Sequence, residues 1–307
     1  MHHQHENQAS DALMRKGRRR KLAQKALPYL LLSPTLVLIL LFLLLPLCYS
    51  AYCSLYRCDY MVFTKFLGLE NYRAVLRDPE IISSIGKAFY ISAISLALAM
   101  VTGILIAQWI HAEKNSRKAY FLQLFVLVPW VTSMVVSSML WKWILQEESG
   151  ILNYFITRLG GKKIGFLTDP KLAIYTLIAV MTWRVIGYVM IQILAGLKVI
   201  PLEYEEAACI DGASKWQLFW KIRIPLLKTP LAISAVIIGL SNLNNLTVPL
   251  TLLGGGPGTS TMVVAIKIYR ESFTNYHFGE ASALSIILCA LNFILMVLYV
   301  KAVKYEI

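Results

Sequence analysis

The chain has 307 residues, of which 57% are hydrophobic and 15% are charged, and its mean hydropathy is +0.60. Soluble domains carry about 25% charged residues, so this balance predicts an integral membrane protein and argues against an ordinary soluble enzyme. The formal net charge of +13 suits nucleic-acid binding only where the basic residues share one soluble surface, so their positions along the chain decide that question.

Residues 1–27 form a basic N-terminal tail ahead of the first apolar run. That run is too long for the core of a signal peptide, and no small-residue cleavage site follows it, so no signal peptide is expected. We interpret the tail's cluster RKGRRRK (15–21) as an orientation signal that also contacts anionic lipid headgroups. Nucleic-acid binding is the weaker alternative. The tail histidines His2, His3 and His5 are interpreted as polar tail residues and not as a metal site.

Six apolar runs are each long enough to cross a bilayer, for which a helix needs about 20 residues. They lie at residues 28–53, 88–110, 120–145, 172–197, 231–253 and 280–300. Pro34 and Pro46 fall inside the first run, where neighbouring helices can satisfy the carbonyls that a proline leaves free. The sequence therefore predicts an all-α integral membrane protein with six transmembrane helices in one domain, residues 28–303, followed by a short tail at 304–307.

The distribution of Lys and Arg predicts how these spans are oriented, because cytosolic loops carry the excess of basic residues. The two tails and the loops at 111–119 and 198–230 together hold 17 of the 30 basic residues, whereas the opposite segments hold 11. The remaining two, Lys142 and Arg184, lie inside spans. Both termini and the 198–230 loop are therefore expected in the cytosol.

The segments on the opposite side include two candidate surface helices. FLGLENYRAVLRDP (66–79) is expected to form one that Pro79 closes, and ESGILNYFITRLGG (148–161) is expected to form another that ends at its glycine pair. Cys53 and Cys58 lie near this membrane face and could pair, although free thiols are favoured. None of the five cysteines has the spacing of a metal ligand.

No Asp or Glu lies in the interior of any of the six spans. Proton-coupled carriers and many ion-coupled carriers need an intramembrane carboxylate, and membrane glycosidases need paired acids. We therefore expect no catalytic residues and no metal site in this chain. A stand-alone secondary carrier or channel is kept as the alternative function.

Four polar residues inside the spans are candidates for a substrate pathway. Arg184 lies near the middle of the fourth span, where a charge must face water or a partner, and a pathway role and a fixed structural cation are equally open. In SNLNNLTVP (241–249), Asn242, Asn244 and Asn245 fall within four positions, and the last two are expected to share one helix face. Their amides suit sugar hydroxyls as well as bonding between helices, and the pathway interpretation is favoured.

The segment GGGPGTST (254–261) superficially looks like a phosphate-binding loop. The required Lys is missing, Thr259 follows Gly258, and no strand precedes the glycines. The segment is also expected on the side away from cytosolic ATP. We interpret it as a turn that ends the fifth span and returns the chain to the membrane.

The 198–230 loop contains EEAACIDGASKWQLFW, which is too polar to span a membrane and too apolar to be an inert connection. A first helix is expected over 202–210, broken at Gly212. Ser214 and the glutamine three residues on form a capping box for a second helix that ends before Pro225. The aromatic residues at helical spacing on this second helix are Trp216, Phe219 and Trp220. Such a hairpin predicts a plug for another protein's cleft, although the aromatic stripe could instead lie in the headgroup layer.

The segment EAACIDGASKWQLFWKIRIPLL (206–227) resembles the EAA motif of the permease subunits of binding-protein-dependent ABC importers. The motif positions filled here are Glu206, Ala207, Ala208, Gly212, Ile222 and Pro225, with Ile224 in place of the usual Leu. The fuller form around Asp211, Ala213 and Trp216 resembles the carbohydrate-uptake subfamily, as do GGGPGTST, IYRESF, FGEASALSIIL and FLGLENY. The resemblance covers about residues 28–303, and the motif is highly specific. One departure is Gly187, where the family often has a proline after a Trp-basic pair.

This resemblance implies a type I ABC importer permease fold in a bacterial cytoplasmic (inner) membrane and a chain that performs no catalysis. It implies that the loop docks as a coupling helix in a groove of a cytosolic ATPase subunit. The residues expected to serve this coupling are Glu206, Ala207, Ala208, Asp211, Gly212, Ala213, Trp216 and Pro225. The implied partners are a second, homologous permease subunit, two ATPase subunits that bind ATP and Mg, an extracytoplasmic solute-binding protein and membrane lipid, with no cofactor in this chain and no nucleic acid. The implied substrate is a carbohydrate, most often an oligosaccharide.

Overall fold

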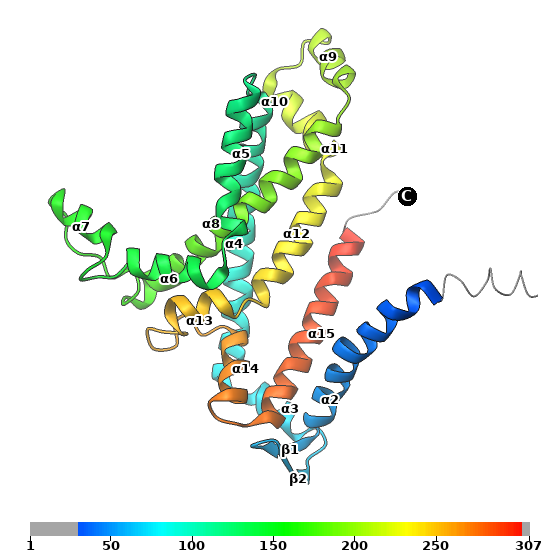
Figure 1. Cartoon of the computed structure of the whole chain (residues 1–307), viewed down its shortest axis with the longest axis vertical. Helices are drawn as coiled ribbons and strands as arrows, with labels where there is room; N and C mark the ends of the chain where they lie inside the picture. The colour runs from blue at the N-terminus through cyan, green and yellow to red at the C-terminus, as the bar shows by residue number, and fades with distance from the viewer. Residues whose placement is uncertain (1–29, 303–307) are drawn as a thin grey trace, which may run out of the picture.

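The computed structural model describes residues 30–302 and consists of long helices that run between two ends (Figure 1). The long helices are Leu30–Cys53, α4 (Pro79–Ala112), α5 (Ser116–Val131), α8 (Pro170–Val199), α12 (Lys228–Leu243) and α15 (Phe278–Ala302). One end, called the β-hairpin end, carries the strands β1 (Tyr56–Asp59) and β2 (Val62–Phe66). The opposite end, called the loop end, carries the short helices α9 (Leu202–Ile210) and α10 (Lys215–Leu218).

Four of the described helices are long and apolar enough to cross a membrane, namely Leu30–Cys53, α4, α8 and Phe278–Tyr299 within α15. Two bent pairs also qualify: α5 with α6 (Met134–Ile144), bent by 95°, and Lys215–Leu226 with α12, bent by 67°. The described chain therefore has four to six candidate membrane helices, which confirms the prediction of a helical, multi-span protein at that level.

The helices α4 and α8 pack along one another, and α5 and α12 pack against α8. Glycines allow close approach: a Cβ on Gly103 of α4 would lie 2.6 Å from Val189 Cγ1 of α8. A Cβ on Gly187 of α8 would lie 2.5 Å from the Val126 carbonyl oxygen of α5. Close backbone contact of this kind is how helices associate in lipid, where water does not drive their burial. Gly187, which departs from the family pattern, therefore has a packing role against α5.

The helix Leu30–Cys53 stands apart from the others over most of its length (Figure 1). Its middle is a π-turn, η1 (Leu40–Leu44), and its last part, α2 (Leu45–Cys53), packs against α15. The leucines of the first half are exposed, and Phe42 in η1 is 76% exposed. An apolar helix that this chain leaves uncovered must be covered by lipid or by another protein.

The predicted third span, 120–145, is not one straight helix. α5 ends at Val131, Thr132 and Ser133 have extended backbone, and α6 then departs at 95°. The Thr132 hydroxyl donates to the Val128 carbonyl oxygen at 2.7 Å, a local bond that competes with continuing the helix. Pro129 in the same turn also lacks the N–H that would strengthen it.

The predicted fifth span, 231–253, is also wrong as a single helix. α12 ends at Leu243, and a separate helix, α13 (Thr247–Leu253), begins after a break. Asn244 Nδ2 donates to the Leu240 carbonyl oxygen at 2.7 Å, and Asn245 Oδ1 accepts from the Val248 N–H at 3.0 Å, in the first turn of α13. The two asparagines therefore end one helix and cap the next, and the expectation that they share one helix face is wrong.

The expectation of an all-α protein is wrong in one respect, because β1 and β2 form a two-stranded antiparallel β-hairpin. Its turn residues Tyr60 and Met61 have φ of 52° and 62°, the left-handed conformation of tight hairpin turns. Cys58 of β1 and Cys53 of α2 are buried nearby and unbonded.

The two predicted surface helices are present. α7 (Ile151–Arg158) ends at the glycine pair as predicted: Gly160 has φ +83°, and the Gly161 N–H donates to the Ile156 carbonyl oxygen at 2.9 Å. α3 (Glu70–Arg77) fills the other segment, but Pro79 does not close it. Pro79 instead opens α4, because Asp78 Oδ1 caps the Glu80 N–H at 2.8 Å.

The glycine-rich segment 254–261 is a turn, as predicted. Gly254, with φ +62°, ends α13, and its N–H donates to the Leu250 carbonyl oxygen at 2.9 Å. The chain then returns through Thr261, whose hydroxyl donates to the Gly256 carbonyl oxygen at 2.7 Å, into α14 (Val264–Phe273).

Candidate functional site

The loop end carries the helical hairpin that the sequence predicts (Figure 1). α9 ends at Ile210, Gly212 turns the chain with φ +80°, and α10 begins after Ser214. The predicted capping box is present: the Ser214 N–H donates to Gln217 Oε1 at 2.8 Å, and the Gln217 N–H donates to Ser214 Oγ at 3.3 Å. The prediction of two short helices joined at a glycine is therefore confirmed.

The second helix of this hairpin runs farther than predicted. α10 continues through a π-turn, η2 (Phe219–Arg223), into α11 (Ile224–Leu226), so it does not end before Pro225. Pro225 follows the π-turn directly, and its missing N–H leaves one hydrogen bond of this continuous helix unmade. The change of direction comes after Leu226, where α12 leaves at 67°.

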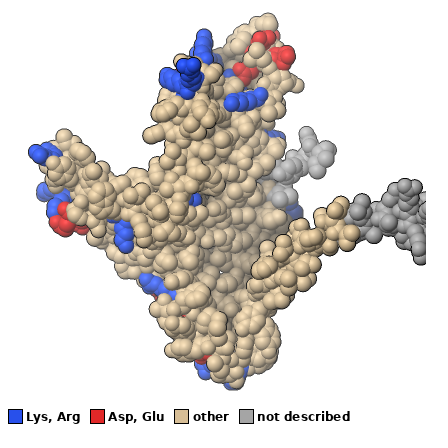
Figure 2. Space-filling model, in the orientation of Figure 1, with Lys and Arg blue, Asp and Glu red and all other residues tan. Residues whose placement is uncertain are grey.

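Most of the eight predicted coupling residues are on the surface of the hairpin. Glu206, Ala207, Asp211, Gly212, Trp216 and Pro225 are exposed, Ala213 is half-buried and Ala208 is buried. The Trp216 side chain is 70% exposed, and its ring lies 5.6 Å from that of Trp220. Acidic side chains gather at the tip of this end, next to basic ones (Figure 2). Exposed aromatic rings of this kind are typical of surfaces that contact another protein or lipid headgroups.

A shallow groove of about 430 Å³ lies between α9 and η2. Its lining residues are Glu203, Tyr204, Ala207, Ala208, Asp211 and Ile222. The two alanines leave space because their side chains end at Cβ, so longer side chains at these positions would fill the groove. The small-residue pair of the motif therefore shapes a concave surface on the hairpin.

A charged pair that sequence reasoning missed holds the hairpin together. Arg223 Nε donates to Glu205 Oε1 and Nη2 to Oε2, both at 2.8 Å, and Nη1 donates to Gln108 Oε1 of α4 at 2.6 Å. Both charged side chains are 18% exposed. The hydrogen bonds from Arg223 hold the pKa of the Glu205 carboxyl below its ordinary value. Nothing in the sequence pairs these residues, because 18 positions separate the two charges and Gln108 lies on a distant helix.

The predicted pathway residue Arg184 is buried, with 5% of its surface exposed. Its Nη1 lies 3.4 Å from the Thr132 carbonyl oxygen, at the break between α5 and α6. Its guanidinium carbon lies 5.9 Å from the centre of the Trp130 ring. These contacts suit a cation that satisfies a carbonyl freed by the helix break.

The three predicted asparagines lie in three different settings. Asn242 is buried, and its Nδ2 donates to Ser95 Oγ of α4 at 3.3 Å. Asn244 is exposed and exchanges two hydrogen bonds with Asn292 of α15, at 3.1 and 2.8 Å. Asn245 caps α13. Together with Arg184, the four candidates therefore make separate contacts and do not converge on one point within this chain.

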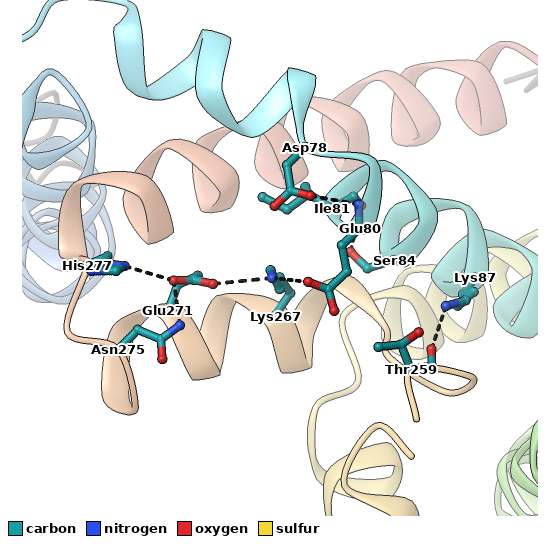
Figure 3. Close-up of polar contacts among 10 residues, drawn as sticks. All are labelled: Asp78, Glu80, Ile81, Ser84, Lys87, Thr259, Lys267, Glu271, Asn275 and His277. Atoms are coloured by element: carbon teal, nitrogen blue, oxygen red, sulfur yellow. Dashed lines mark hydrogen bonds and ion pairs between the residues drawn. The ribbon is translucent and has the colours of Figure 1, made fainter. Parts of the chain in front are cut away.

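At the β-hairpin end, α4 and α14 are joined by a polar network (Figure 3). Lys267 Nζ lies 2.7 Å from Glu80 Oε2 and 3.5 Å from Glu271 Oε1. Glu271 Oε2 also accepts from Asn275 Nδ2 at 2.9 Å and lies 3.3 Å from His277 Nδ1. Burial lowers the pKa of Lys267, but the two carboxylates outweigh it and hold that pKa above its ordinary value.

Within residues 30–302, one group of side chains has the spacing of metal ligands: Glu271, His277 and Glu280, whose ligand atoms lie within 4.8 Å of one another. Glu271 is already neutralised by Lys267 and bonded by Asn275. The charge of this group is therefore met by the protein itself.

Comparison with known proteins identifies the family that this chain matches. The family described as "Binding-protein-dependent transport system inner membrane component" matches residues 99–303, which include the loop-end hairpin. A probable ABC transporter permease protein of Pyrococcus horikoshii is 36% identical over 284 residues, covering 89% of this chain and 95% of its own length. The trehalose/maltose transport system permease protein MalF of Thermococcus litoralis is 29% identical over 290 residues, covering 93% and 96%.

A solved structure shares the fold. It is a bacterial alginate ABC transporter in complex with an alginate pentasaccharide-bound periplasmic protein, and one of its chains matches with a TM-score of 0.81 at 22% identity. The match covers 92% of this chain and 96% of that chain. The expectation of a non-catalytic ABC importer permease is confirmed, because in this family ATP is hydrolysed by a separate subunit. The chain belongs to the family of binding-protein-dependent transport system inner membrane components, the permease subunits of ABC transporters.

Proposed function

We propose that the chain forms half of the translocation pathway of an ATP-driven importer for a carbohydrate, delivered by an extracytoplasmic binding protein. The observation that carries this proposal is the exposed hairpin of α9 and α10, turned at Gly212 and held by Glu205 and Arg223. Relatives named for trehalose/maltose transport and a structural neighbour named for alginate support a saccharide substrate. An oligosaccharide is the substrate class that we favour.

We further propose six spans in a bacterial cytoplasmic membrane, with the bent pair α5–α6 counted as one span, α12 as the fifth span without α10 and α11, and both termini in the cytosol. The excess of Lys and Arg on the tails and on the loops at the loop end supports this orientation. The permease domain would cover residues 28–303, flanked by the tails 1–27 and 304–307. The basic cluster and the histidines of the N-terminal tail lie outside the described residues.

The hairpin is proposed to dock in a cleft of a cytosolic ATPase subunit. Glu206 and Trp216 would contact that subunit, the alanine-lined groove would receive one of its side chains, and Gly212 would set the angle between the two helices. The complete assembly would contain a second, homologous permease and two ATPase subunits, which bind ATP and Mg. The uncovered helix Leu30–Cys53 fits a place against lipid or the second permease.

The substrate pathway is proposed to include Arg184, Asn242, Asn244 and Asn245. Asn244 is the best placed for direct contact, because its amide is exposed and its partner Asn292 can be replaced by sugar hydroxyls. Arg184 and Asn242 are buried in this chain and would hold the walls of the pathway at the breaks of two spans.

The experiment that tests the proposed function is purification of the full-length chain from its native membrane through an affinity tag. The expected result is co-purification with an ATPase that has a phosphate-binding loop and with a second multi-span protein. ATP hydrolysis by this complex should rise when the loaded binding protein is added. A chain that purifies alone and moves saccharide into vesicles without ATP would establish the alternative, a stand-alone carrier.

Replacement of Asn244 by Ala is expected to raise the concentration of loaded binding protein that half-maximally stimulates ATP hydrolysis. The loss of one hydrogen bond to substrate corresponds to a shift of about threefold to tenfold. Thr102→Ala is the matched control, because Thr102 is a half-buried polar residue of a span whose hydroxyl bonds its own helix at the Leu98 carbonyl oxygen. An equal shift in both variants would remove Asn244 from the pathway.

A further inference from the structure

We infer that α4 acts as a rigid rod. It transmits movement of the docking hairpin (α9 and α10), at the loop end, to the β-hairpin end of the molecule. It does so through two polar attachments: at the loop end Arg223 bonds both Glu205 and Gln108, and at the other end Lys267 pairs with Glu80. This inference rests on the proposed function and adds a route that the chain connectivity does not supply, since the hairpin is covalently joined to α8 and α12 and not to α4.

The length and continuity of α4 suit it to this role. It runs without interruption from Pro79 to Ala112, which is 34 residues or about 50 Å. It therefore reaches from the β-hairpin end to the loop end (Figure 1). Two neighbouring candidate spans cannot act as single rods, because α5–α6 is bent by 95° and α11–α12 by 67°. The contact of Gly103 with Val189 also keeps α4 close to α8, so the rod is guided along its length.

At the loop end, the attachment is made by a planar charged fork. Arg223 uses two nitrogens on the Glu205 carboxylate and a third on Gln108 Oε1, at 2.8, 2.8 and 2.6 Å. A bidentate pair of this kind is geometrically specific, so α9, η2 and the last turns of α4 are held in one orientation. Its low exposure also keeps water from competing for these bonds.

The exposed docking surface of the hairpin is separate from this attachment. Glu206, next in sequence to Glu205, is exposed, as is Trp216. A partner can therefore bind the outer side of the hairpin while Glu205 and Arg223 hold its inner side. A displacement of the hairpin would then move the end of α4 with it.

At the β-hairpin end, two lysines attach α4 to the elements that follow α13 (Figure 3). Lys267 of α14 bridges Glu80, in the first turn of α4, and Glu271. Lys87 of α4 donates to the Thr259 carbonyl oxygen in the glycine-rich turn. Glu80 and Lys87 are seven residues apart, which places them on one face of α4, toward α14 and that turn. A shift of α4 is therefore passed to both.

The test uses the co-purified complex in lipid nanodiscs, with the five native cysteines replaced by serine and one reporter, Thr274→Cys, at the exposed end of α14. The rate at which a maleimide labels the reporter is measured with and without Mg-ATP and vanadate. With both attachments intact, nucleotide is expected to change this rate about fivefold or more. In Lys267→Gln, the change is expected to fall below about twofold while ATP hydrolysis continues, and in Arg223→Gln it is expected to fall below the same limit in the fraction of complex that retains the ATPase.

Two further variants separate transmission from general damage. The charge exchange Glu205→Arg with Arg223→Glu is expected to restore the nucleotide response, because the Gln108 amide can donate as well as accept. Glu113→Gln removes the 2.8 Å pair with Lys118 at the same end and is expected to leave the response unchanged.

Each adverse result has a distinct meaning. A full nucleotide response in Arg223→Gln and Lys267→Gln would overturn the rod, as would an intact complex that hydrolyses ATP without any change at the reporter. Failure of the chain to co-purify with an ATPase would instead contradict the proposed function.

Discussion

Replacing Gly212 by valine is expected to release the ATPase from the complex and to abolish ATP-driven uptake. Gly212 has φ +80°, a conformation in which a β-branched residue is strained by about 1–3 kcal/mol. A Cβ at this position meets no atom within 4 Å, so the expected effect comes from backbone strain and not from a clash. The strain turns α10 relative to α9, and the docking surface then no longer matches its cleft. The measurement is the amount of ATPase that co-purifies with the tagged chain, expected to fall at least about tenfold.

Gly160 provides the matched control, because it has φ +83° and is likewise free of atoms within 4 Å of a Cβ. Gly160→Val therefore carries the same backbone cost at the end of α7, far from the docking hairpin, and is expected to keep the ATPase bound. Gly212→Asn should have an intermediate effect, since asparagine tolerates left-handed backbone better than valine does. Equal retention of the ATPase in Gly212→Val and Gly160→Val would contradict the docking role of the hairpin.

Features set by neighbouring residues could be predicted from the sequence. The turn at Gly212, the capping box at Ser214 and the end of α7 at Gly160 all depend on residues within one helical turn. Their backbone demands are local, so composition and spacing identify them. The two helices of the candidate docking hairpin and the turn between them depend on such local features and could be predicted, whereas the continuation of the second helix through Pro225 and the Glu205–Arg223 pair were missed.

The two spans that break could not be predicted from hydropathy. The apolar runs 120–145 and 231–253 are long enough to cross a membrane, yet each contains side chains that form hydrogen bonds with the helix backbone. Thr132 does so after α5, and Asn244 and Asn245 do so after α12. The sequence shows that such residues are present, but whether their local bonds prevail over the helix depends on the packing of α6 and α13.

The polar attachments of α4 were missed for a different reason. Glu205, Arg223 and Gln108 come together only after α4 and the hairpin have packed, and 115 positions separate Arg223 from Gln108. The pairing of Lys267 with Glu80 spans 187 positions. A single sequence offers no signal for contacts this distant, because nothing in the residues next to each of these side chains identifies its partner.

Replacing Gly187 by alanine is expected to lower the stability of the chain strongly for so small a change. The added Cβ would lie 2.5 Å from the Val126 carbonyl oxygen and 3.1 Å from Leu127 Cα. Both atoms belong to the backbone of α5, so the clash cannot be relieved by a side-chain rotation, and α5 must move away from α8. Overpacking of this kind costs about 1–3 kcal/mol. The free energy of unfolding in mixed micelles, measured by denaturing-detergent titration, is the appropriate readout.

Gly86 of α4 is the control for Gly187, because a Cβ there meets no atom within 4 Å. Alanine in a helix is favoured over glycine by about 1 kcal/mol, so Gly86→Ala is expected to raise the free energy of unfolding. The same substitution should therefore have opposite signs at the two positions, and the difference isolates the contact between α5 and α8. A stabilising effect at Gly187 as well would mean that α5 and α8 lie farther apart than this packing requires. Arg184, which lies 3.4 Å from the Thr132 carbonyl oxygen at the end of α5, would then lose its fixed place beside the break.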